Sequence, residues 1–195
     1  MKVIVTGASA GIGRGIAKAL AEGGCAIGAL ARSEDALDSL NDEISASGGV
    51  CHTSSTDLRS PDEAAAGIAA LAEALGGVDA LINNAGLVIR KNALELELDE
   101  WHAMVETNLN GLFYATRATL PGMIENGRGH IVNISSISGY LPLGGGSGYA
   151  ATKYAVTGFS ESLFQEVREH GIKVTTVFPG SIDSDSHRHQ GDDGS

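Results

Sequence analysis

The sequence is short of cysteine, of basic side chains and of long apolar runs. Its 2 cysteines cannot form a disulfide framework and lack the spacing of metal ligands, so we expect free thiols, no metal site and a reducing, cytoplasmic location. Lys and Arg number 13 against 24 Asp and Glu, a formal net charge of −11 that disfavours binding to nucleic acid. No apolar run reaches the roughly 18 residues of a membrane span and no signal segment opens the chain, so we expect no membrane partner.

Proline is also scarce, at 4 residues, whereas glycine is abundant at 27 of 195. That glycine content is about twice the usual ~7%. Apolar residues make up 43% of the chain, enough for a sizeable core. Many glycines with few prolines are typical of a fold with many tight turns between strands and helices.

Short β-branched runs alternate with helical stretches along the chain. The expected strands are 3–5, 26–30, 50–54, 80–82, 131–134 and 173–178, and the expected helices are 13–22, 34–46, 61–75, 99–125 and 149–170. The third helix has the clearest start, with Ser60 as cap, Pro61 in the first turn and Glu63 completing a capping box. This alternation predicts one α/β domain, a Rossmann-like, doubly wound parallel sheet flanked by helices, over residues 1–184. Residues 185–195 are expected to be a polar tail or the start of a missing substrate lid.

A glycine-rich turn connects the first strand to the first helix. It reads Thr6-Gly7-Ala8-Ser9-Ala10-Gly11-Ile12-Gly13, with spacing G-x-x-x-G-x-G rather than G-x-G-x-x-G. Glycines let a backbone approach a pyrophosphate, and the helix N-terminus supplies free N–H groups and positive partial charge. Taken alone, the turn fits a dinucleotide site and a simple tight turn about equally well.

Other motifs follow in an order that resembles the short-chain dehydrogenase/reductase family in its standard, non-extended form. The resemblance runs from Met1 to about Ser184 and rests on the 6–13 turn, Asn83-Asn84-Ala85-Gly86, Asn108, Ser136, Tyr149-Ala150-Ala151-Thr152-Lys153 and Pro179-Gly180. It implies a small carbonyl or alcohol substrate, an NAD(P) cofactor and a homodimer or homotetramer. The cofactor-binding positions that it implies are Gly7, Ser9, Gly11, Ile12, Gly13, Arg32, Asp57, Leu58, Asn84, Ala85, Gly86, Tyr149, Lys153, Pro179, Gly180, Ile182 and Ser184.

The end of the second expected strand bears on the choice between NAD and NADP. An acid there binds the ribose 2′-hydroxyl of NAD, whereas an arginine accommodates the 2′-phosphate of NADP. Here the acid position holds Ala31 and the next residue is Arg32. We therefore expect NADP to be preferred, although Arg32 also fits a solvated charge in front of a helix.

The expected reaction centre is Ser136, Tyr149 and Lys153, with Asn108. Tyr149 and Lys153 are four residues apart, so they share one helix face, and Ser136 precedes Tyr149 by thirteen residues. Carbonyl reduction needs a hydride and a proton, and a tyrosine with pKa near ~10 needs help from a cation such as Lys153 to act at neutral pH. Ser136 would orient the substrate oxygen, with Ser135 structural. Asn108 resembles the family's helix-kinking, water-holding asparagine, or satisfies a local backbone group.

Two narrower interpretations remain open. The segments 116–123 and 191–194 are similar to the 3-hydroxy acid (serine-type) dehydrogenase branch. Alternatively, the chain is a catalytically idle NADP-binding regulatory or scaffold protein. The intact Ser136, Tyr149 and Lys153 favour an enzyme, whereas the early C-terminus favours the idle protein, because family members continue through a lid, a helix and a last strand.

Overall fold

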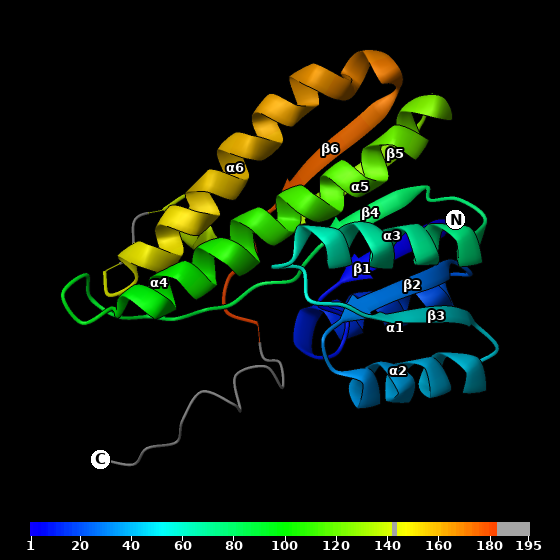
Figure 1. Ribbon diagram of the computed structural model, residues 1–195, viewed down its shortest axis with the longest axis horizontal. Helices are drawn as coiled ribbons and strands as arrows, with labels where there is room; N and C mark the ends of the chain where they lie inside the picture. The colour runs from blue at the N-terminus through cyan, green and yellow to red at the C-terminus, as the bar shows by residue number, and fades with distance from the viewer. Residues whose placement is uncertain (142–143, 183–195) are drawn as a thin grey trace.

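Six strands form a single parallel sheet in the computed structural model, which describes residues 1–141 and 144–182 (Figure 1). The strand order is β3-β2-β1-β4-β5-β6. The strands are β1 (Lys2–Thr6), β2 (Ala26–Ala31), β3 (Val50–Ser55), β4 (Ala80–Asn83), β5 (Gly129–Ile134) and β6 (Ile172–Val177). This is the Rossmann-like, doubly wound sheet expected from the sequence. The order reverses between β1 and β4, and such a reversal opens a crevice at the carboxyl ends of the strands.

Helices cover both faces of the sheet (Figure 1). They are α1 (Gly11–Glu22), α2 (Glu34–Ala46), α3 (Pro61–Leu75), α4 (Leu98–Val105), α5 (Gly111–Glu125) and α6 (Ser147–Val167), with single turns η1 (Glu106–Asn110), η2 (Ile137–Gly139) and η3 (Arg168–His170). The central residues of strand β1 are all apolar because helices cover both faces of this strand. Val3 and Val5 pack with α1 and α2, while Ile4 packs with α3, α5 and α6. Within the described part of the chain, no helix is long and apolar enough to cross a bilayer.

The helix expected over 99–125 is divided into α4, the π-helical turn η1 and α5. A π turn inserts one extra residue and shifts the register of the side chains that follow. Asn108, at the centre of η1, is only 1% exposed. The division therefore places a polar side chain in the interior, beside the crevice.

The capping box expected at α3 is half present. The Ser60 hydroxyl accepts a hydrogen bond from the Glu63 N–H at 3.3 Å, as expected. The Glu63 carboxylate accepts from the Asp57 N–H at 3.1 Å instead of from Ser60, because the Ser60 N–H already donates to the Asp57 carbonyl. Glu63 therefore fastens the loop after β3, which borders the crevice.

Candidate active site

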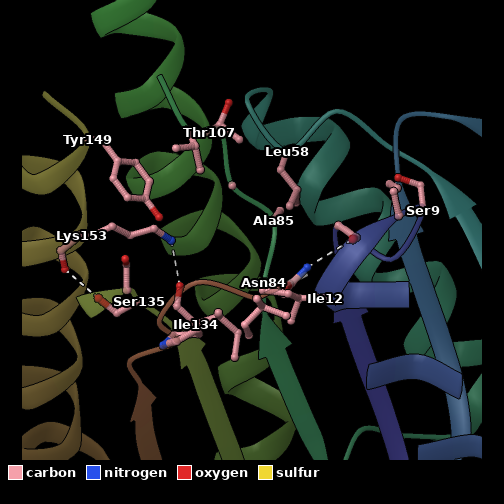
Figure 2. Close-up of a pocket in the computed structure, with 18 of the residues that line it drawn as sticks. Ser9, Ile12, Leu58, Asn84, Ala85, Thr107, Ile134, Ser135, Tyr149 and Lys153 are labelled. Atoms are coloured by element: carbon pink, nitrogen blue, oxygen red, sulfur yellow. Dashed lines mark hydrogen bonds between the residues drawn. The ribbon is translucent and has the colours of Figure 1, made fainter. Parts of the chain in front are cut away.

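A cleft of about 360 Å³ lies at the carboxyl ends of the strands, where the strand order reverses (Figure 2). Its walls come from the β1–α1 turn, the ends of β2, β3 and β5, the loop after β4, the start of α6 and the segment after β6. The predicted residues that line it are Gly7, Ser9, Ile12, Arg32, Asp57, Leu58, Asn84, Ala85, Gly86, Ser136, Tyr149, Lys153, Pro179, Gly180 and Ile182. Residues distant in sequence therefore meet at one site.

Some predicted site residues do not line this cleft. Gly11, Gly13 and Asn108 are absent from its walls. Ser184 lies outside the described residues, as does the whole of the segment 185–195.

Sequence reasoning also missed residues that line the cleft, among them Arg59, Thr107 and Arg90. Arg59 is two residues from the predicted Asp57, and Thr107 directly precedes Asn108, so proximity to a motif could have found both. Arg90 belongs to no motif, and only the folded loop after β4 brings it to the cleft.

The glycine turn fits a dinucleotide pyrophosphate. Gly7 and Gly11 have φ of 65° and 55°, which favours glycine, and a Cβ on Gly7 would stand 2.7 Å from the Ala85 Cα. Helix α1 begins after Ala10, with no side-chain cap and no acid in its first turn, whereas Ser33 caps α2 and Ser60 caps α3. The first N–H groups of α1 thus have no side-chain partner at the cleft, where a phosphate would accept from them.

Asn84 clamps the two loops that flank the middle of the cleft. Its Nδ2 donates to the carbonyls of Thr6 at 3.1 Å and Gly7 at 3.2 Å. The N–H groups of Asn84 and Ala85 donate in return to the Thr6 hydroxyl, at 3.0 and 3.1 Å. These bonds fix the glycine turn against the loop after β4, which gives the cofactor end of the cleft a rigid wall.

The Tyr149 and Lys153 side chains lie next to each other on α6 and face the cleft (Figure 2). Both are nearly buried, at 7% and 5% exposed, and the Lys153 Nζ lies 5.8 Å from the centre of the Tyr149 ring. That Nζ donates to the Ile134 carbonyl at 2.8 Å. Ser136 hydrogen-bonds the Tyr149 hydroxyl, and the Ser135 hydroxyl donates to the Lys153 carbonyl at 3.1 Å, which fastens α6 to the end of β5.

Burial controls the protonation of this pair. It raises the pKa of Tyr149, and the hydrogen bond from Ser136 and the positive charge of Arg90 oppose that rise. Burial also lowers the pKa of Lys153 to about 8. Arg90 is thus a cation that favours the Tyr149 phenolate, and the expectation that Lys153 lowers the pKa of Tyr149 stays a prediction.

The lowered pKa of Lys153 predicts a pH-dependent contribution to stability. Between about pH 8 and the unfolded pKa of about 10.5, the unfolded chain holds a proton that the folded chain has released, so folding becomes more favourable as pH rises. From about pH 7 to about pH 9.5, the cofactor-free wild type should gain about 2 kcal/mol of unfolding free energy over Lys153→Met. Urea unfolding of both proteins at the two pH values measures this difference. If the difference in unfolding free energy between the two proteins were the same at both pH values, the pKa of Lys153 would not be lowered in the folded chain.

Asn108 uses its side chain to hold the loop after β4. Its Nδ2 donates to the Leu87 carbonyl at 2.9 Å and to the Thr152 hydroxyl at 3.0 Å, and its Oδ1 accepts from the Leu87 N–H at 2.6 Å. The backbone groups that Asn108 satisfies belong to a residue 21 positions away in the sequence, and its role in holding a water for proton transfer stays a prediction. Through Thr152 these hydrogen bonds connect the loop after β4 to the helix that carries Tyr149.

Two arginines lie at the far end of the cleft from Tyr149. The Asp57 carboxylate accepts from the Nε and Nη2 of Arg59, and this hydrogen bonding lowers the pKa of Asp57. The guanidinium of Arg32 is exposed and forms no ion pair with residues 1–141 or 144–182. Arg32 therefore retains the donors that a 2′-phosphate would need.

Comparison with known proteins agrees with this architecture. The family model described as short chain dehydrogenase matches residues 1–194. The chain is 39% identical to the NADP-dependent 3-hydroxy acid dehydrogenase YdfG of Salmonella typhi, over 99% of this chain and 78% of that protein. It is 36% identical to the 3-oxoacyl-[acyl-carrier-protein] reductase FabG of Vibrio cholerae, over 93% of this chain and 73% of that one.

Solved structures match at the level of the whole sheet. A metagenomic short-chain oxidoreductase in complex with NADP superposes with a TM-score of 0.88 at 37% identity, covering 93% of this chain and 83% of that one. An actinorhodin polyketide ketoreductase variant with NADPH gives 0.92 at 37% identity, covering 95% and 72%. Relatives thus match the chain along nearly its whole length, in sequence and in fold, and the protein belongs to the short-chain dehydrogenase family of oxidoreductases.

Proposed function

We propose that the protein is an NADP-dependent oxidoreductase that interconverts a small carbonyl compound and a secondary alcohol, with Tyr149 as the acid and base. The observation that carries the proposal is the buried Tyr149 hydroxyl, bonded to Ser136 and beside Lys153, in the same cleft as the uncapped start of α1. One end of the cleft suits a dinucleotide phosphate, and the other presents a proton donor.

The chain's residues would divide the reduction as follows. NADPH held by the glycine turn and Arg32 would supply the hydride for the carbonyl carbon and would itself be oxidised to NADP⁺. Tyr149 donates its phenolic proton to the carbonyl oxygen, so hydride and proton together complete the alcohol. Ser136 hydrogen-bonds the same oxygen and holds it at Tyr149. The Lys153 ammonium stabilises the phenolate that Tyr149 leaves, until a proton from solvent restores the hydroxyl.

The test is consumption of NADPH by the purified chain with a panel of small ketones, aldehydes and 3-oxo acids, followed by absorbance. We expect turnover on at least one member. Saturable NADPH binding without any turnover would instead support the idle regulatory or scaffold protein.

Arg32 should determine the preference for NADP. Arg32 directly follows β2 and lines the cleft. Its guanidinium, which has no ion-pair partner among the described residues, would form charge-assisted hydrogen bonds with the 2′-phosphate that NADH lacks. We expect Arg32→Ala to weaken NADPH binding about 10- to 100-fold and NADH binding less than about threefold. Fluorescence titration with both cofactors measures this, with Arg168→Ala, on the remote turn η3, as the control. Equal losses for the two cofactors would rule out the assignment.

A 3-hydroxy acid dehydrogenase is the narrower candidate within this class. It is supported by the relative of that name in Salmonella typhi, at 39% identity. A homodimer or homotetramer is the assembly that we propose from the family resemblance. The exposed apolar side chains Leu98, Trp101, Phe113 and Phe164 on α4, α5 and α6 are consistent with it.

A further inference from the structure

Four basic side chains line the cleft, and two of them are already engaged. They are Arg32, Arg59, Arg90 and Lys153. Arg59 is bound to the Asp57 carboxylate, and the Lys153 ammonium donates to the Ile134 carbonyl. Neither Arg32 nor Arg90 forms an ion pair with any residue that the structure describes. The chain as a whole has a formal net charge of −11, yet this cleft holds two guanidinium groups without an ion-pair partner. Such a local positive charge attracts anionic ligands.

The two unpaired arginines, Arg32 and Arg90, lie at different ends of the cleft. The charge of Arg32 acts on Asp57, at the end assigned above to the 2′-phosphate. Arg90 lies on the loop after β4, and its Cγ is 4.0 Å from the position that a Cβ on Gly146 would occupy. Gly146 is the N-cap of α6, three residues before Tyr149, and the charge of Arg90 acts on the Tyr149 phenol. Arg90 therefore lies at the end where the substrate is reduced.

We propose that Arg90 is a specificity-determining residue that binds a carboxylate of the substrate, so that the enzyme prefers 3-oxo acids and 3-hydroxy acids over uncharged ketones and alcohols. The proposal rests on the function proposed above. A guanidinium matches a carboxylate with two parallel hydrogen bonds, and a cleft filled by cofactor and substrate strengthens that pairing by excluding water.

The arrangement also gives the substrate two separate binding points. Tyr149 and Ser136 hold the carbonyl oxygen at the start of α6 and the end of β5, while Arg90 approaches from the loop after β4. A short oxo acid presents an oxygen to the first pair and a carboxylate to Arg90 at the same time. Val88, on the same loop, adds an apolar wall suited to the carbon chain between the two groups.

The test compares an acid with its own ester. Acetoacetate and methyl acetoacetate carry the same ketone, and only the acid is charged. We expect the wild type to have the higher kcat/KM with the acid. Arg90→Met should lower kcat/KM about 10- to 100-fold with the acid and less than about threefold with the ester. Arg90→Lys should retain part of the preference, and the loss should fall mainly on KM.

Arg168→Met is the matched control, because it removes the same charge from η3, at the opposite end of α6. It should leave kcat/KM unchanged with both the acid and the ester. Equal losses with acid and ester in Arg90→Met would overturn the proposal, since Arg90 would then act only on Tyr149 or on the fold. A wild type that prefers the ester would also overturn it.

A binding measurement separates this proposal from the proposed function. Butyrate has the carboxylate and no carbonyl, so its calorimetric binding to the protein saturated with NADP⁺ requires no turnover. We expect Arg90→Met to bind butyrate at least about tenfold more weakly than the wild type and Arg168→Met to bind it equally well. Absence of turnover with intact, Arg90-dependent butyrate binding would reject the oxidoreductase and keep the carboxylate site. Butyrate binding that is insensitive to Arg90 would reject the site.

Discussion

Replacing Tyr149 by phenylalanine is expected to lower turnover by about 1,000-fold, within the range that a positioned general acid contributes. The change removes one hydroxyl and keeps the ring that packs at the start of α6, where the side chain is 7% exposed. The lost hydrogen bond with Ser136 is worth about 1 kcal/mol, so the fold should persist. NADPH binding should stay within about twofold, because the glycine turn, Arg32 and Lys153 are untouched.

Tyr154→Phe is the matched control on the same helix. Tyr154 is 45% exposed, and its hydroxyl donates to the Tyr140 carbonyl at 2.9 Å, outside the cleft. Both variants lose one phenolic hydroxyl and one hydrogen bond, so their stabilities should be similar while their activities differ. Steady-state rates with the best substrate of the panel decide the matter. A Tyr149→Phe protein that keeps a tenth or more of wild-type activity would mean that another group donates the proton.

The centre of the sheet was predictable because strands β1, β2 and β4 are buried along nearly their whole length. Val3, Ile4 and Val5 form a continuous apolar run, which indicates a central parallel strand covered by helices on either side. The glycine turn at Gly7 indicated where a dinucleotide would bind, because such a turn follows the carboxyl end of the first strand of a parallel sheet. Motif spacing then supplied Tyr149, since its position at the start of a helix orients it toward that edge.

Features that depend on contacts across the fold were not predictable. The π turn at 106–110 contains no proline or glycine that would mark a break, so the sequence indicates one continuous helix through it. The Glu63 carboxylate accepts from the Asp57 N–H in the loop before α3 and not from the Ser60 N–H at the start of the helix. The reason is that the Ser60 N–H already donates to the Asp57 carbonyl. Arg90 reaches Tyr149 only after the loop folds onto α6, and its effect on the phenol is electrostatic, which no local pattern records.

Replacing a glycine of α1 by alanine should have opposite effects on stability at two positions only two residues apart, Gly13 and Gly15. A Cβ on Gly13 would overlap the Asn84 Nδ2 and the Gly7 carbonyl oxygen, whereas a Cβ on Gly15 meets nothing within 4 Å. Gly13→Ala must push α1 away from the glycine turn or break the Asn84 clamp, at a cost of about 1–3 kcal/mol. Gly15→Ala should add about 0.4–1 kcal/mol, because alanine favours the helix and restricts the unfolded chain.

The same pair tests how the cofactor end is built. Since Asn84 holds the carbonyls of Thr6 and Gly7, displacing it in Gly13→Ala should misplace the N–H groups at the start of α1 and weaken NADPH binding at least about tenfold. Gly15→Ala should bind NADPH as the wild type does. Urea unfolding and fluorescence titration of both variants measure the two effects. If Gly13→Ala were destabilised yet bound NADPH normally, close packing of α1 on the turn would serve stability alone, and the phosphate site would have to form elsewhere in the cleft.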